Sequence, residues 1–144
     1  MKEIGPKDAH DALGKDPAIV LVDVRSVPEF QGGHPKGALN IPIMSKGPGG
    51  GAMMPNQDFM AVFTAAVPKD KKVLVSCMSG NRSARAVMLL EQGGWKDVTN
   101  VRCGFGGARD MMGNLTEPGW AALGLPTEQG DPAGRAYADL KKKA

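Results

Sequence analysis

The chain has 144 residues and a formal charge of +3, with 42% hydrophobic and 23% charged residues. This length is close to the most common size of a domain with one hydrophobic core. A single tyrosine and the lack of a stripe of basic and aromatic residues argue against a nucleic-acid surface, and no apolar stretch is long enough to cross a membrane.

The first third of the chain alternates between helical and extended patterns. Residues 6–13 are predicted to form a helix, because proline is tolerated in a first turn and Gly14 lies near the end. The nearly continuous apolar run over residues 19–24 predicts a strand that is covered on both faces. A short strand is expected at residues 39–41, where Pro42 ends it.

Residues 45–55 include three consecutive glycines and are therefore predicted to be a mobile surface loop. A flap near the site, a contact for a partner and an insertion without a role are all compatible with this pattern. Asn56 is then expected to cap a helix that runs to about residue 66, with Phe59, Val62 and Phe63 on its buried side.

A second strand and helix follow in the middle of the chain. The apolar residues 73–75 predict a central parallel strand, and helical spacing begins at Ser83 and stops at Gly93 and Gly94. Residues 98–101 are predicted to form the last strand. This alternation predicts an α/β fold, a small parallel sheet flanked by helices on both faces, with ligands bound beyond the carboxyl ends of the strands.

Cys77 follows the predicted central strand and opens the segment Cys-Met-Ser-Gly-Asn-Arg, directly before the helix. The N–H groups of such a loop converge, and a helix N-terminus carries partial positive charge, so both favour a thiolate at Cys77. Gly80 lets the backbone curl without a Cβ penalty, and Arg82 and Arg85 add positive charge. The alternative is an inert core cysteine that happens to follow a strand.

This loop resembles the active-site loop of the rhodanese family, the sulfurtransferases that carry sulfur as a cysteine persulfide. Further segments resemble the family in order and spacing, so that the similarity runs from about residue 4 to residue 126. These segments are residues 21–25, 29–30, 33–34, 37–42, 106–107 and 120–126. The resemblance implies a rhodanese-like fold with Cys77 as the catalytic residue, and no cofactor or metal is expected.

The resemblance also implies that the loop after Cys77 binds the substrate and the persulfide, and that Arg85 attracts the donor. The loop residues are Met78, Ser79, Gly80, Asn81, Arg82 and Ser83. Related phosphatases and arsenate reductases with this fold have one more residue between the cysteine and the arginine. Their longer ring fits a tetrahedral oxyanion, whereas the shorter loop here favours a single extra sulfur atom.

The resemblance predicts a thiosulfate sulfurtransferase. The Cys77 thiolate would take sulfane sulfur from a small anionic donor such as thiosulfate and pass it to a thiophilic acceptor. That acceptor would be cyanide, a thiol or a protein cysteine. The alternative is a persulfide carrier or binding module that recognises a partner protein and turns over little free thiosulfate.

Residues 109–119 depart from a compact rhodanese, because the closing tryptophan, Trp120, comes later than usual after the glycine pair. This insertion, which contains Met111 and Met112, is expected to narrow access to the site or to add a docking face. Cys103 lies at the end of the last predicted strand. It is either a small buried residue or a resolving thiol for Cys77, and the sequence alone does not settle this.

Asp23 and Arg25 lie at a strand end, where we expect them to form ion pairs, with each other or with Glu29, and to support the Cys77 loop rather than to react. His34 is interpreted as a hydrogen-bonding turn residue that resembles the family's turn histidine. His10, on a charged helix, is expected to be solvated.

The predicted domain organisation is a single rhodanese-like domain over residues 1–130, followed by a basic helix or tail over residues 131–144. Asp131 is expected to cap that helix, with Pro132 in its first turn. The first ten residues lack the apolar core of a signal peptide, so a cytoplasmic location is expected, or a periplasmic one if a signal peptide has been removed. No nucleic-acid or membrane partner is expected.

Overall fold

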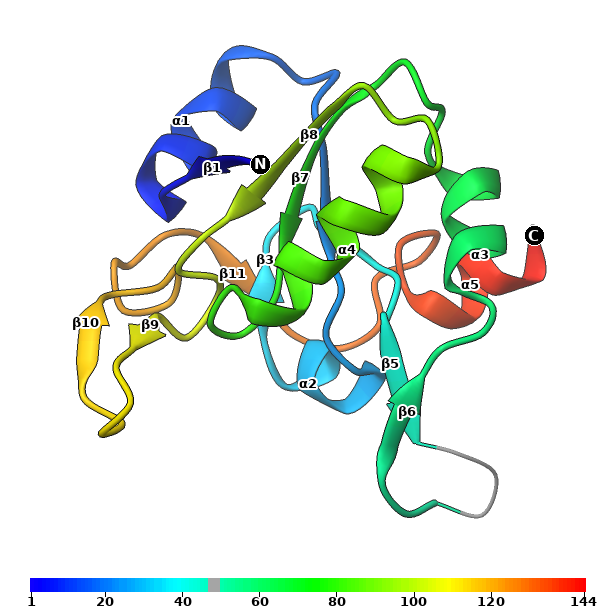
Figure 1. Cartoon of the computed structure of the whole chain (residues 1–144). Helices are drawn as coiled ribbons and strands as arrows, with labels where there is room; N and C mark the ends of the chain where they lie inside the picture. The colour runs from blue at the N-terminus through cyan, green and yellow to red at the C-terminus, as the bar shows by residue number, and fades with distance from the viewer. Residues whose placement is uncertain (47–49) are drawn as a thin grey trace.

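Five parallel strands form the main sheet, in the order β1-β8-β7-β2-β4, in the computed structural model, which describes residues 1–46 and 50–144 (Figure 1). The strands of this sheet are β1 (Lys2–Ile4), β2 (Val20–Asp23), β4 (Leu39–Asn40), β7 (Lys72–Ser76) and β8 (Asp97–Val101). The helices are α1 (Pro6–Lys15), α2 (Val27–Gly32), α3 (Phe59–Ala66), α4 (Asn81–Gln92) and α5 (Tyr137–Lys142). The predicted α/β class is confirmed.

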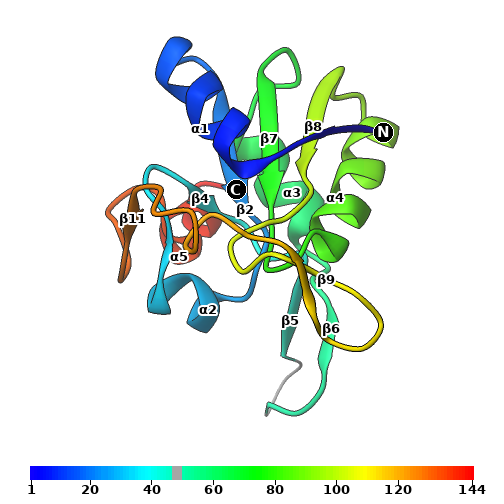
Figure 2. The same ribbon diagram turned by 90° about the vertical axis from the view of Figure 1, so that its left-hand side faces the viewer.

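Helices cover both faces of the sheet, as predicted (Figure 2). Successive side chains of a strand point to opposite faces, so neighbouring residues of β7 enter two different clusters. Val73 and Val75 pack in the cluster that α3, α4 and α5 cover. Leu74 packs in the second cluster, with Phe30 of α2 and Trp120. The apolar runs of the central strands therefore reflect burial on both sides.

One strand of the main sheet, β1, and one helix that packs on it, α2, were not predicted. The strand β1 is a short edge strand whose residues are largely exposed, so it carries no apolar pattern. The helix α2 begins with a capping box in which the Ser26 hydroxyl accepts the Glu29 N–H and the Glu29 carboxylate accepts the Ser26 N–H. This Ser-x-x-Glu spacing is a helix start signal that is readable in the sequence.

The expected loop at residues 45–55 is partly wrong, because its flanks form an antiparallel ribbon. Strand β5 (Met44–Lys46) pairs with β6 (Met53–Pro55), while residues 47–49 of the predicted loop lie outside the described residues. A second ribbon joins β9 (Ala108–Arg109) to β10 (Leu115–Glu117) within the insertion. Both ribbons extend from the side of the sheet where the carboxyl end of β7 lies (Figures 1 and 2).

Two predicted caps are corrected. The Asn56 side chain accepts the N–H of Asp58 and forms a turn, and α3 begins after it, at Phe59. In the C-terminal segment the Asp131 carboxylate binds the Gln31 side chain, and α5 begins only at Tyr137. The ribbon of β3 (His34–Pro35) and β11 (Thr127–Glu128) precedes this segment, and the buried Leu140 of α5 packs in the core with α3 and α4.

Candidate active site

Cys77 lies between the end of β7 and the start of α4, and 1% of its surface is exposed. The backbone N–H of Gly80 donates a hydrogen bond to its Sγ, at 3.1 Å. Gly80 has a φ of +104°, and a Cβ there would lie 2.1 Å from the carbonyl oxygen of Arg102. The sharp turn that places this N–H on the sulfur therefore requires glycine.

A neighbouring segment binds the backbone carbonyl groups of Cys77 and Met78. The N–H of Phe105 donates to the Cys77 carbonyl and the N–H of Gly106 to the Met78 carbonyl, each at 2.8 Å. In a trans peptide the N–H points opposite to the C=O, so the N–H groups of Met78 and Ser79 face the other way. The first N–H groups of α4 also lack intrahelical partners. Within the described residues the Gly80 N–H is the backbone donor that binds Cys77 Sγ, and convergence of the other loop N–H groups stays a prediction.

Ser83, in the first turn of α4, places its Oγ 3.3 Å from Cys77 Sγ. The same Oγ lies 2.5 Å from Oδ1 of Asn100, a buried residue of β8. Asn100 was not among the predicted site residues, although a buried asparagine among the apolar residues of a strand is a readable signal.

Arg82 is not a free positive charge at the site, contrary to expectation. Its guanidinium forms two hydrogen bonds with the carboxylate of Glu29 on α2, at 2.7 and 3.0 Å. These bonds lower the pKa of Glu29 to about 2 and raise the pKa of Arg82. Of the two alternatives for Asp23 and Arg25, a pair with Glu29 is wrong, because Glu29 binds Arg82, and a pair with each other is observed. The pair ties α2 to the loop.

Arg85 is exposed on α4, and no carboxylate of residues 1–46 or 50–144 lies within salt-bridge distance of it. It lines a cavity of about 230 Å³ together with Asn81 and Arg82 of the loop and with Ile43 and Met44. Asn81 is exposed, and so is Met78 in the loop.

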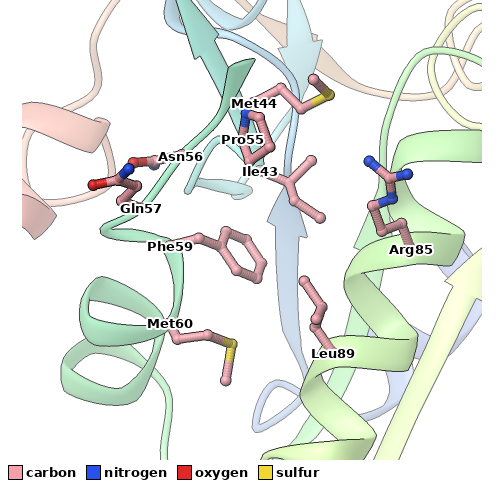
Figure 3. A pocket seen from close by; sticks show the side chains of 9 residues that line it. All are labelled: Ile43, Met44, Pro55, Asn56, Gln57, Phe59, Met60, Arg85 and Leu89. Atoms are coloured by element: carbon pink, nitrogen blue, oxygen red, sulfur yellow. The ribbon is translucent and has the colours of Figure 1, made fainter. Parts of the chain in front are cut away.

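A smaller cavity of about 120 Å³ adjoins this one and shares Ile43, Met44 and Arg85 with it. Figure 3 shows Phe59 and Leu89 pointing toward Ile43 between α3 and α4, with Arg85 at one side. The space beside the loop is thus apolar on one side and positively charged on the other.

The comparison with known proteins decides the family. The family model described as Rhodanese-like domain matches residues 5–109. Thiosulfate sulfurtransferase 16, chloroplastic, of Arabidopsis thaliana is 35% identical over 107 residues, which are 74% of this chain and 78% of that protein. Thiosulfate sulfurtransferase GlpE of Haemophilus influenzae is 30% identical over 106 residues, 74% of this chain and 86% of that protein.

The fold comparison agrees. The crystal structure of Rv0390 from M. tuberculosis is 31% identical, with a TM-score of 0.73 over 90% of this chain and 98% of that one. The chain belongs to the rhodanese-like family. The predicted family is confirmed, and sulfur transfer in general is the activity of this rhodanese domain.

Asp23 and Arg25 form a buried ion pair in the rhodanese domain, at 2.8 Å. The Arg25 guanidinium also donates to the carbonyl of Gly33, at 2.6 Å, and lies over the Phe105 ring, 4.6 Å from its centroid. The N–H of Phe105 binds the Cys77 carbonyl, so Phe105 contacts both the pair and the loop, and the expected support of the loop by the pair stays a prediction. Both side chains are buried, and neither lines the cavity beside Arg85.

Cys103 and Cys77 are both free thiols. Burial, and then a hydrogen bond with the Glu117 carboxylate, raise the pKa of Cys103 to about 11. A thiol that stays protonated is a poor nucleophile, so the environment favours a small buried residue over a resolving thiol.

The insertion of the rhodanese domain is a ribbon with an ordered tip. The Asp110 carboxylate accepts the N–H groups of Met112 and Asn114, both at 2.9 Å, and Arg109 donates to the carbonyl of Gly113. Met111 and Met112 are fully or nearly fully exposed.

The two histidines of the rhodanese domain differ. His34 is buried, and its Nδ1 donates to the Phe30 carbonyl at 2.6 Å, consistent with the predicted turn residue. His10 forms a T-shaped ring pair with Trp120 and is half-buried, instead of being fully solvated. Within the described residues there is no group of three or more metal-ligating side chains, and no helix there could span a membrane.

Proposed function

We propose that this rhodanese domain moves sulfane sulfur from a small anionic donor such as thiosulfate to a thiophilic acceptor through a persulfide on Cys77. The observation that supports this most directly is the Gly80 N–H on Cys77 Sγ, in a loop with four residues between Cys77 and Arg82. N–H donors around a sulfur atom stabilise a negative charge on it or on an atom bound to it.

In the first half-reaction the Cys77 thiolate attacks the outer sulfur of thiosulfate. The S–S bond of the donor breaks, its electron pair leaves with sulfite, and Cys77 carries a persulfide whose negative charge lies on the terminal sulfur. The N–H groups of Met78 and Ser79, turned away from the carbonyls that Phe105 and Gly106 bind, are the donors available to this atom. Arg85 supplies the attraction for the dianionic donor, since Glu29 already neutralises Arg82.

In the second half-reaction a nucleophile attacks the terminal sulfur, and Cys77 leaves as a thiolate. Cyanide would serve in an assay, and a small thiol or a protein cysteine would be the acceptor in a cell. Because the donor product leaves before the acceptor reacts, the kinetics should be ping-pong.

A second candidate is a persulfide carrier that serves one protein partner and turns over little free thiosulfate. The buried position of Cys77 and the exposed methionines of the two ribbons, Met53, Met54, Met111 and Met112, favour it. Exposed methionines adapt to different partner surfaces.

Intact-mass measurement after incubation with thiosulfate tests the persulfide directly. We expect the wild type and Cys103→Ser to gain one sulfur atom, and Cys77→Ser to gain none. Addition of cyanide should then remove the added mass and release thiocyanate. Substantial turnover by Cys77→Ser would reject the mechanism. Slow cyanide turnover with fast transfer to a protein thiol would favour the carrier.

A further inference from the structure

Asn100 makes three contacts that fix the orientation of its side-chain amide. Its Nδ2 lies 3.3 Å from the carbonyl oxygen of Gly80 and 3.3 Å from a carboxylate oxygen of Glu3 on β1. Both of these groups only accept hydrogen bonds, so the NH₂ group must face them. The opposite orientation would place the amide oxygen against two acceptors. Oδ1 of Asn100 therefore faces Ser83.

The orientation of Asn100 determines where the single hydroxyl proton of Ser83 points. The distance of 2.5 Å between Ser83 Oγ and Asn100 Oδ1 marks a strong hydrogen bond, and Oδ1 cannot be its donor. The hydroxyl proton is thus engaged with Asn100. Ser83 Oγ, 3.3 Å from Cys77 Sγ, then presents a lone pair to the sulfur.

A lone pair facing Sγ affects the two forms of Cys77 differently. In the free thiolate the negative charge lies on Sγ, which has one N–H donor, from Gly80, and faces the lone pair of Ser83. In the persulfide Sγ is uncharged, because the charge lies on the terminal sulfur. The lone pair therefore disfavours the thiolate relative to the persulfide.

We propose that Glu3, Asn100 and Ser83 form a chain of positioning residues that holds the hydroxyl proton away from Cys77 and so biases the domain toward its sulfur-loaded form. This inference rests on the proposed persulfide. It adds which residues set the equilibrium between the free thiolate and the persulfide of Cys77. The balanced reaction is Cys77–S⁻ + S₂O₃²⁻ ⇌ Cys77–S–S⁻ + SO₃²⁻. Ser83 and Asn100 are both buried, at 0% and 2% exposure, so water does not replace these contacts.

The test is the equilibrium of this reaction, measured as the loaded fraction by intact mass over a series of thiosulfate-to-sulfite ratios, at a pH alkaline enough to ionise the free thiol. In Asn100→Leu the Ser83 hydroxyl is released and can donate to the thiolate. We expect half-loading to need a thiosulfate-to-sulfite ratio roughly tenfold higher than in the wild type, the effect of one hydrogen bond to a charged group.

Ser83→Ala separates this effect from simple loosening of the loop. Without the hydroxyl, Asn100→Leu should cause no further shift, so the double variant should match Ser83→Ala. An equal shift in both backgrounds would mean that Asn100 only anchors the Gly80 carbonyl, and the inference would be wrong. No shift in Asn100→Leu would also overturn it.

Glu3→Ala keeps the test decisive if Asn100→Leu does not fold, because Glu3 is exposed on an edge strand. It should shift the ratio in the same direction by a smaller amount, and only when Ser83 is present. Lys2→Ala, on the same strand, is the matched control and should leave the ratio unchanged. A wild type that never gains sulfur would reject the proposed function, whereas a loaded wild type with additive variants would reject this inference alone.

Discussion

Two buried thiols follow neighbouring strands of one sheet, and their surroundings are opposite in sign. Cys77 follows β7 and receives the N–H of Gly80, whereas Cys103 follows β8 and faces the Glu117 carboxylate. Both side chains are almost fully buried. Burial alone therefore does not distinguish the proposed reactive cysteine, Cys77, from the proposed structural one, Cys103. The groups that contact each sulfur atom, the Gly80 N–H at Cys77 and the Glu117 carboxylate at Cys103, distinguish the two.

The difference originates in one segment that serves both sites. The N–H groups of Phe105 and Gly106 bind the carbonyls of Cys77 and Met78, so the N–H groups of those two peptides point the opposite way. Gly104 is required for this approach, because a Cβ there would lie 2.4 Å from the Cys77 carbonyl oxygen. Cys103 precedes the same segment, is fully buried and hydrogen-bonds with Glu117 of β10.

The largest effect expected from this comparison is on turnover. Cys77→Ser should lower sulfur transfer by roughly a thousandfold or more, because it removes the nucleophile. Cys103→Ser should retain activity within about twofold, because its protonated thiol has no part in the proposed steps. Thiocyanate formation from thiosulfate and cyanide measures both. A Cys103→Ser variant as inactive as Cys77→Ser would end the distinction between the two thiols.

The next largest effect concerns the turn at Gly80. Gly80→Ala combines a strained positive φ with a Cβ 2.1 Å from the Arg102 carbonyl oxygen, so the loop must move and sulfur loading should be lost. Gly37→Ala is the matched control, since Gly37 has a φ of +88° with nothing within 4 Å of the added Cβ.

Urea unfolding of the two glycine variants checks this. Gly37→Ala should cost about 1–2 kcal/mol of folding free energy, the strain of the left-handed conformation alone, and still load sulfur. Gly80→Ala should cost more than that. Equal stability and equal loading of both variants would show that the close approach of Arg102 has no role.

A smaller effect is expected for the charge beside the loop. Arg85→Gln should raise the KM for thiosulfate severalfold with little change in kcat, and the effect should shrink as salt is added. Arg82→Gln should instead lower stability, since it leaves the partly buried Glu29 carboxylate without its partner. Lys96→Gln, a charge change at another position, provides the control. A KM that depends on Arg82 and not on Arg85 would reverse these assignments.

The parts of the site that the sequence predicts are those made by neighbours in the chain. The apolar strand, Gly80 and the start of α4 lie within a few residues of Cys77, so propensity and turn chemistry were enough to place the loop. The capping box at Ser26 is equally local, so the start of α2 is also marked in the sequence.

The remaining contacts join residues that are far apart in sequence. The partner of Arg82 is Glu29, and Ser83 meets Asn100 only because β8 lies beside β7. No local pattern specifies which of several charged or polar residues forms such a pair. The pairing of β5 with β6 was missed for a related reason, since the glycines between them suggested an irregular segment throughout.

The smallest expected effect is on the ionisation of Cys103, and it tests the other half of the comparison. In Cys77→Ser, alkylation of the remaining thiol by iodoacetamide should rise with pH toward a midpoint near 11, because burial and Glu117 raise the pKa of Cys103 from its ordinary value of 9.0. Glu117→Gln should move the midpoint down, and Glu128→Gln, at a carboxylate that pairs with Arg135, should leave it unchanged.

Since the pKa of Cys103 is raised by folding, the associated stability is fully present below pH 9.0 and is lost as the pH rises toward 11. The free energy of unfolding should therefore fall over that range more in Cys77→Ser than in the Cys77→Ser, Cys103→Ser double variant. A Cys103 that alkylates at neutral pH as fast as a free thiol would place a reactive sulfur at both strand ends and remove the contrast between them.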